Sequence, residues 1–204
     1  MNLCALRGSI DENNRNITKA SKILGKELKP DRFDHTLGVA YTAANMAFIH
    51  GADVEKALIA GFLHDCAKCM SHEDQIKICE KNKIEISEVE RRNHSLLHAK
   101  VGMFLARTKY DVYDNDILNA IRWHTTGRED MSLLEKIIYI ADFIEPNRKP
   151  LEDMNAIRQE AYSDIDRCLA HILHNSVIYL KTIGKEIDDA TMIAYEYYKD
   201  KYKD

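Results

Sequence analysis

The stretch ALIAGFLHD, residues 57–65, decides the fold of this chain. Seven uncharged, mostly apolar residues run directly into an adjacent histidine and aspartate, His64 and Asp65. A run of this kind with helical neighbours on both sides is typical of a buried helix. Imidazole and carboxylate are also two of the common metal-ligand types. The stretch therefore predicts a helical scaffold with a metal site at the end of a buried helix.

The rest of the chain is also patterned as helices. Its 204 residues include only three prolines and eight glycines, and the apolar residues recur at helical spacing. We predict an all-α fold of about nine helices, with one domain over residues 16–204 and a flexible N-terminal extension over residues 1–15. Helix starts are marked by capping residues and helix ends by glycine or proline. The predicted starts are Ser71 with Asp74, Ser87 with Glu90, Ser132 with Glu135, Asp31, Asp53 and Asp114, and the predicted ends are Gly51, Gly127, Pro146 and Gly184.

Composition and charge exclude several classes of function. The net charge is only -4, so the basic surface that dominates nucleic-acid affinity is missing and we expect no polynucleotide partner. No stretch of 18 apolar residues and no signal-peptide core is present, so we expect no membrane partner. The five cysteines form an odd number, which fits reduced thiols in a cytoplasmic protein.

Six residues on five predicted helices or their ends are the candidates for chemistry. A single histidine on an apolar face is more often a hydrogen-bonded core residue, so the combination carries the prediction. His35 shares an apolar stripe with Val39 and Met46 and should point inward. Asp142 lies in the run IIYIADFI, where a carboxylate must be paired or metal-bound to offset its desolvation. Imidazole with carboxylate suits iron, manganese or zinc, whereas oxygen ligands alone suit magnesium or calcium. The six candidates are His35, His64, Asp65, His98, His124 and Asp142.

Two other patterns could bind metal. Cys66 and Cys69 form a C-x-x-C pair, but no second cysteine pair completes a zinc site and no strand precedes it. His94 lies four residues before His98, and an i,i+4 pair can chelate one metal on a helix face. Because His98 shares its face with Val101, we assign the inward position to His98.

The order of these residues resembles the HD-domain phosphohydrolase superfamily. Its pattern of a histidine, a later His-Asp doublet and a distant aspartate is matched by His35, His64-Asp65 and Asp142. His98 and His124 resemble the additional ligands of members with two metals. More narrowly, several motifs are similar to the YqeK-type family of bacterial symmetrical bis(5'-nucleosyl)-tetraphosphatases. These motifs are residues 32–39, 63–68, 96–98, 124–128 and 140–148, of which HTTGR and ADFIEPNR are the most specific.

The resemblance implies a metal-dependent enzyme that hydrolyses diadenosine tetraphosphate, and related dinucleoside polyphosphates, symmetrically to two ADP by a metal-activated water. It implies one or two iron ions, with manganese, cobalt or zinc as alternatives. His35, His64, Asp65 and Asp142 would hold the first metal. His98 and His124 would hold or assist at a second position, with Asp65 bridging. Asp65, His98 and His124 are therefore the residues expected to act in catalysis.

Basic and hydroxyl groups near these ligands are the expected contacts to the polyphosphate. Arg148 could bind a phosphate through a forked guanidinium contact. Thr125 and Thr126 could donate hydrogen bonds to a phosphate or could simply cap a turn, and Lys68 taken alone could be a solvated charge. The expected contacts are Lys68, Thr125, Thr126, Arg128 and Arg148.

Two alternative functions stay open at this point. One is another HD phosphohydrolase activity on nucleotides or cyclic dinucleotides, because a fold does not fix its substrate. The other is a non-catalytic HD-type nucleotide-binding signalling module, which would be expected to have lost ligands that are all present here. The apolar stripe of the helix predicted over residues 164–183 should pack in the core, although a spare face could serve a homodimer.

Overall fold

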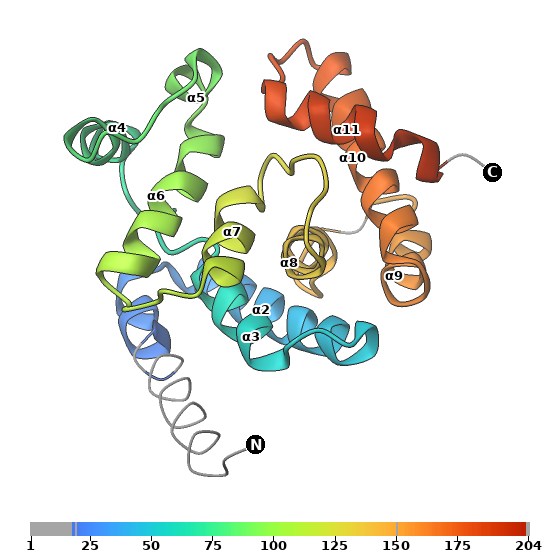
Figure 1. Cartoon of the computed structure of the whole chain (residues 1–204), viewed down its shortest axis with the longest axis horizontal. Coiled ribbons are helices and arrows are strands. Elements are labelled where there is room, and N and C mark those ends of the chain that lie inside the picture. Colours follow the sequence, from blue (N-terminus) through green and yellow to red (C-terminus); the bar gives the residue numbers. More distant parts are fainter. Residues whose placement is uncertain (1–17, 19, 150, 203–204) are drawn as a thin grey trace.

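The chain is described by a computed structural model for residues 18, 20–149 and 151–202, and this part is helical without strands (Figure 1). The all-α prediction is confirmed. The number of helices is slightly above nine, partly because caps at Ser87 and Asn93 separate the five-residue helix α5 from its neighbours. The predicted extension, residues 1–15, lies outside the described residues. Residues 20–27 are helical, and the labelled helices are α2 (Pro30–His50), α3 (Val54–Leu63), α4 (His72–Lys81), α5 (Glu88–Arg92), α6 (His94–Thr108), α7 (Asn115–Trp123), α8 (Leu133–Ile144), α9 (Met154–Ser163), α10 (Ile165–Thr182) and α11 (Asp189–Tyr202).

Local capping sets most helix starts where the sequence predicts them. The exception is Asp31, because α2 begins one residue earlier, at Pro30, and Lys29 makes no side-chain cap. Proline suits the first helical position, since its φ is already helical and the missing N–H needs no partner. The confirmed caps are Ser71, Ser87, Ser132, Asp53 and Asp114, each accepting a backbone N–H two or three residues ahead.

The predicted helix ends hold in three of four positions. Gly51 and Gly184 follow α2 and α10 with φ of 74° and 65°, in the left-handed conformation, and Pro146 lies two residues beyond the end of α8. Gly127 does not end a helix, because α7 already stops at Trp123. Gly127 instead closes the next turn by donating its N–H to the Trp123 carbonyl oxygen at 2.9 Å.

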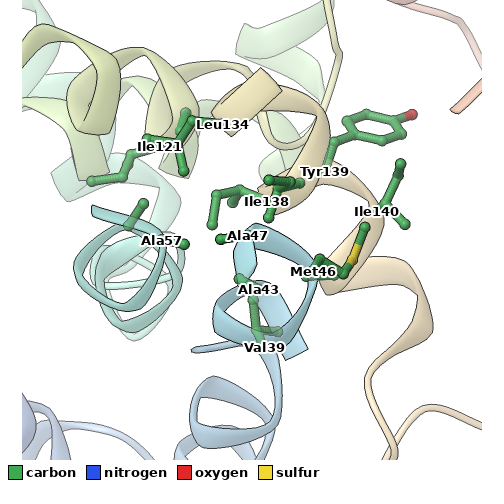
Figure 2. Close-up of a cluster of buried hydrophobic side chains, with 14 of the residues drawn as sticks. Val39, Ala43, Met46, Ala47, Ala57, Ile121, Leu134, Ile138, Tyr139 and Ile140 are labelled. Carbon is green, nitrogen blue, oxygen red and sulfur yellow. The ribbon is translucent and has the colours of Figure 1, made fainter. Parts of the chain in front are cut away.

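Helix α8 lies among the other helices and contacts α2, α3, α7, α9 and α10 (Figure 1). Ile137, Ile138 and Ile140 of this helix are fully buried. Figure 2 shows Ile138 beside Ala43 and Ala47 of α2. Burying one such aliphatic side chain stabilises the fold by about 1.5–3 kcal/mol. This packing fixes α8 and with it the position of Asp142, one turn beyond Ile138.

Helices α2 and α3 approach each other closely at a glycine. A Cβ placed on Gly61 would lie 2.6 Å from the Cα of Ala40, so any side chain there would force the two helices apart. His64 follows Gly61 by three residues at the end of α3. The glycine therefore determines how near His64 comes to the side chains of α2. Within the described residues, none of the helices combines the length and apolar character needed to span a membrane.

Candidate metal centre

The structure brings all six predicted ligand side chains together. One part, called here the cleft-side group, consists of His35, His64 and Asp142. His35 Nε2 lies 3.0 Å from Asp142 Oδ1 and 3.4 Å from His64 Nε2. His64 Nε2 lies 3.8 Å from the same Asp142 oxygen. One donor atom from each residue falls within 4.8 Å of the other two, which is a spacing that a single metal ion could bridge.

The other part, called here the inner group, consists of His98 and His124. Their Nε2 atoms are 3.1 Å apart, and they lie 3.0 and 3.6 Å from Asp65 Oδ1. The second oxygen of Asp65, Oδ2, faces the cleft-side group, 3.6 Å from His64 Nε2 and 3.9 Å from His35 Nε2. Asp65 therefore contacts both groups, one with each carboxylate oxygen.

Two of the imidazoles are oriented by the same local device. His64 and His124 are the C-cap residues of α3 and α7. Each ring donates from Nδ1 to the backbone carbonyl three residues earlier, Gly61 at 2.6 Å and Ile121 at 2.7 Å. Because a carbonyl oxygen only accepts, Nδ1 must carry the hydrogen, and a neutral ring then has its lone pair on Nε2. Both lone pairs point into the cluster.

His35 is oriented by a buried carboxylate that the sequence reasoning missed. Its Nδ1 donates to Glu145 Oε1 at 2.9 Å, and Glu145, only 1% exposed, also accepts the Asn147 N–H at 2.7 Å. Gly38 leaves room for this carboxylate, because a Cβ there would lie 2.3 Å from Glu145 Oε2. An acidic residue at the end of the apolar helix α8, inside the ADFIEPNR motif, was the signal that could have identified Glu145.

Burial and neighbouring charges set the protonation of the cluster. Burial lowers the pKa of His64 and of His98 to about 4, so both rings are neutral at pH 7. Burial opposes ionisation of Asp65, but His64, His124 and His98 hold the pKa of that carboxyl well below its usual range. Burial likewise opposes ionisation of Asp142, but His35 and Arg148 lower the pKa of its carboxyl.

His35 is the exception among the histidines with shifted pKa values. Burial disfavours a charge on the ring, yet Asp142 and Glu145 together raise the pKa of His35 above its ordinary value. The two carboxylates therefore favour a positive charge at this position. Either a proton on the ring or a metal ion at Nε2 can supply it, since metal and proton compete for the same lone pair.

The orientation of the donors fits a divalent cation. The Nδ1 contacts of His35, His64 and His124 turn their Nε2 atoms toward one another and toward carboxylate oxygens. Lone pairs and anionic oxygens this close repel unless a proton or a metal ion lies between them. Metal-binding histidines usually donate their other ring N–H to a carboxylate or a backbone carbonyl, as these three rings do. Nitrogen and oxygen donors together suit a transition metal better than magnesium or calcium.

Three of the predicted substrate contacts lie close to the ligands. Lys68 Nζ is 3.3 Å from each ring nitrogen of His98, and burial lowers the pKa of this lysine. Arg148 donates from Nε to the Asp142 carbonyl at 2.7 Å and from Nη2 to the Asp142 carboxylate. Thr125, next to His124 in the chain, has a buried hydroxyl with no hydrogen-bond partner among the described residues.

The other two predicted contacts are engaged within the protein. Thr126 donates its hydroxyl to the Gly127 carbonyl at 3.0 Å. Arg128 forms a forked pair with Glu135, with both N···O distances 2.8 Å, and Glu135 in turn caps the start of α8. The structure thus gives Arg128 a part in ordering the turn after His124, and its contact with phosphate stays a prediction.

A cleft of about 920 Å³ opens beside the cleft-side group. His35 and Glu145 line it, together with Arg32 and Arg148. Arg32, a residue that the sequence reasoning did not single out, donates from Nη1 to Asp65 Oδ2 at 2.9 Å. It precedes His35 by three residues in the RFDHTLGV motif, so its position one turn away on the same helix could have identified it.

Comparison with known proteins agrees with this geometry. The HD domain matches residues 32–147, a range that includes all six ligand candidates. A crystal structure from Clostridium acetobutylicum, described as an HD superfamily hydrolase involved in NAD metabolism, is similar with a TM-score of 0.86 and 40% identity. The similarity covers 90% of this chain and 96% of that one.

Sequence relatives narrow the class further. A protein of Halalkalibacterium halodurans named symmetrical bis(5'-nucleosyl)-tetraphosphatase is 36% identical to this chain. The alignment covers 87% of this chain and 94% of that relative. The protein of that name in Bacillus subtilis is also 36% identical, over 89% of this chain and 97% of the relative. The chain therefore belongs to the HD-domain family and, within it, to the family of these symmetrical bis(5'-nucleosyl)-tetraphosphatases. Family and donor set together make the cluster a divalent metal site.

Proposed function

We propose that this protein is a metal-dependent phosphohydrolase that cleaves diadenosine tetraphosphate symmetrically into two ADP, with iron as its metal. The observation that carries the proposal is the convergence of six histidine and aspartate side chains beside a cleft lined by arginines. Full-length relatives with the corresponding name supply the substrate. A non-catalytic module is disfavoured because every ligand of the cluster is present and inward-facing.

We assign the six side chains to two metal positions. His35, His64 and Asp142 with Asp65 Oδ2 would hold one ion, and His98 and His124 with Asp65 Oδ1 would hold or assist a second. When bound, such a metal lowers the pKa of a coordinated water and neutralises charge on phosphate oxygens. The donor set also suits manganese, cobalt or zinc, so the choice of iron rests on the family resemblance.

The chain's own cations would bind the phosphates and offset the charge that develops during cleavage. Arg148 uses Nε and Nη2 for Asp142, while its Nη1 has no partner among the described residues and can donate to a phosphate oxygen. Lys68 lies beside His98 of the inner group. Donors fixed in place before the reaction stabilise developing charge without reorganising. Thr125 can add a hydroxyl donor near His124.

Product analysis tests the reaction. The protein is incubated with diadenosine tetraphosphate and iron, manganese or cobalt, and early time points are separated by chromatography. Symmetrical cleavage gives ADP alone, whereas an asymmetric cut gives AMP and ATP in equal amounts. In water enriched with oxygen-18, one labelled atom should enter per cleavage, so half of the ADP should carry it on the terminal phosphate. Formation of AMP with ATP, or no turnover with any of these metals, would overturn the assignment of diadenosine tetraphosphate as the substrate. Nucleotides and cyclic dinucleotides are assayed in parallel as alternative substrates.

A further inference from the structure

The chain continues beyond the matched HD domain, which ends at residue 147, into α9, α10 and α11 (Figure 1). Helix α9 contacts α2, α8 and α10. Its residues Met154, Ile157 and Ala161 are buried in the core. This packing places α9 beside α8, the helix that carries Asp142. A side chain of α9 can therefore reach the end of α8 from outside the HD domain.

Arg158 of α9 makes this contact. Its Nε donates to the Ile144 carbonyl oxygen at 3.0 Å, and its Nη2 donates to the Glu145 carbonyl oxygen at 3.3 Å. The side chain is half-buried, and among the described residues it forms no ion pair. A charge that is partly removed from water normally faces an opposite charge, because its desolvation costs free energy. The position of Arg158 is therefore explained by the end of α8 and not by an acidic partner.

The end of α8 offers acceptors for such a cation. The last turn of a helix leaves carbonyl oxygens without partners in the helix and carries the negative end of its dipole. The last turn of α8 contains no basic residue of its own. Arg148 donates from Nε to the Asp142 carbonyl at 2.7 Å, and Arg158 binds the carbonyls of Ile144 and Glu145. Two arginines from beyond the helix thus cap α8, but only Arg148 also lines the cleft.

Glu145 connects this cap to the metal centre. Its ψ is 152°, so the chain leaves the helix at this residue. Its carbonyl oxygen accepts from the Arg148 N–H at 3.1 Å and from Arg158, and its carboxylate accepts from His35 Nδ1 at 2.9 Å. The Arg148 contact is local, whereas the Arg158 contact ties Glu145 to a different helix. The orientation of the His35 ring thus depends on a residue whose backbone Arg158 holds.

We propose that Arg158 is a positioning residue of the metal centre, which fixes the backbone at Ile144 and Glu145 and so holds the Glu145 carboxylate against His35. This inference rests on the proposed function, because it takes His35 as a metal ligand. Arg158 does not line the cleft, so it acts through Glu145 and not on the substrate. The chain beyond the HD domain thereby contributes to the metal centre.

The test measures the affinity of the protein for manganese by competition with a chelator, which requires no substrate. Arg158→Ala should raise the Kd by about tenfold, the lower end of the range for residues that support a ligand. Arg158→Lys should recover part of this loss, because an ammonium group can donate to one carbonyl but lacks the fixed fork that binds two. Melting temperatures measure the stability lost with the cap separately.

A double substitution distinguishes positioning from packing. If Arg158 acts through Glu145, Arg158→Ala should weaken manganese binding no further in a protein that already carries Glu145→Ala. Residues that act independently would show additive losses of binding free energy, and that result would overturn the inference. An unchanged Kd in Arg158→Ala would overturn it as well. If Arg158→Ala does not fold, the same comparison is made with Arg158→Lys.

Arg167→Ala is the matched control. Arg167 is a half-buried arginine of α10 whose Nε lies 3.3 Å from Glu160 of α9, so its loss loosens α9 without touching the end of α8. The control should keep the wild-type Kd, and an equal loss there would show that the effect is not specific to Arg158. If His35→Ala keeps its metal, the ligand assignment of the proposed function fails. If His35→Ala loses metal while Arg158→Ala binds normally, only the present inference fails.

Discussion

The two ligand groups around Asp65 are held in different ways. In the cleft-side group, charged side chains hold the ligands: Glu145 holds His35, and Arg148 holds Asp142. In the inner group, a backbone carbonyl holds His124, and Lys68, which does not line the cleft, lies against His98. Both rings are only about 1% exposed. A charged partner that reaches the cleft can position a ligand and also meet the substrate. A backbone carbonyl can only orient the ring.

This difference predicts where substitutions should act. Changes at the cleft-side partners should affect metal affinity and substrate binding, because the same residues line the cleft. Changes in the inner group should affect the second metal position without altering the cleft. His64 is intermediate, since it belongs to the cleft-side group but is oriented by a backbone carbonyl, as His124 is.

The largest effect is expected where the two groups meet. Asp65→Ala removes both carboxylate oxygens that connect them, so hydrolysis and metal retention should be lost while helicity stays near wild type. Metal analysis, activity assays and circular dichroism measure the three quantities. Loss of a residue that only supports a ligand typically costs about 10–100-fold, so a variant that keeps measurable activity with bound metal would show that Asp65 does not bridge.

The next substitutions separate the groups. His35→Ala should empty the cleft-side position, whereas His98→Ala or His124→Ala should spare one metal and lose the second. The stoichiometry of metal per chain in the purified variants gives the answer. If the His98 and His124 variants hold as much metal as wild type, these histidines act on the substrate, as phosphate contacts or as a general acid.

A smaller effect is expected from the carboxylate behind His35. Glu145→Ala should weaken metal affinity by about 10–100-fold, as is usual for residues that support a ligand. Glu145→Gln should lose less, because its amide oxygen can still accept from His35 Nδ1. Competition with a metal chelator measures both.

Gly38→Ala offers an independent check on Glu145. Alanine in place of glycine within a helix normally favours the helix by about 1 kcal/mol, yet here the new Cβ would displace the carboxylate. We therefore expect weaker metal binding, as in Glu145→Ala. Unchanged chelator competition in Gly38→Ala and Glu145→Ala would show that Glu145 has no part in orienting His35.

An effect of similar size, on catalytic efficiency instead of metal affinity, is expected at an arginine of the cleft. Arg148→Ala should lower kcat/KM by about one to two powers of ten at saturating metal, since charge-assisted hydrogen bonds contribute roughly 1.5–3 kcal/mol. The variant should still hold metal, because every ligand remains, but with lower affinity, because Arg148 no longer positions Asp142. Arg91→Ala is the matched control, because Arg91 is an exposed arginine paired with Glu80 outside the cleft. Wild-type kinetics in Arg148→Ala would show that Arg148 does not contact the substrate.

Arg128→Ala distinguishes a phosphate contact from a purely structural pair with Glu135. Loss of a phosphate contact would raise KM, whereas loss of the structural pair would lower only the melting temperature.

The sequence predicted most helix starts because a cap is a local feature. Ser87 and Ser132 find their partners three residues away, so the pattern alone identifies them. The predicted helix start at Asp31 was wrong for an equally local reason, since Pro30 already begins the helix. The six ligand candidates were recognisable because an ionisable group on an apolar face needs a buried partner or a metal ion to offset its desolvation. Their convergence is now visible, whereas the assignment of each side chain to a particular metal position stays a prediction.

The supporting residues were not predictable in the same way. Glu145 and His35 are 110 residues apart in the chain, and Arg32 and Asp65 are 33 apart. Nothing in the local pattern of either residue says which partner it meets. Their pairing depends on the packing of α8 against α2, and on α3 approaching α2 at Gly61.

By itself the sequence determined the helical class, the ends of most helices and the donor types available for a metal, because these follow from periodicity, capping and side-chain chemistry over a few residues. The tertiary structure decided which oxygen of Asp65 faces which histidines, which carboxylate orients His35, and that arginines from two separate elements border one cleft. Those relations are set by the distance and angle between packed helices. A shift of an ångström at a contact such as Gly61 against Ala40 would change them without altering any local pattern.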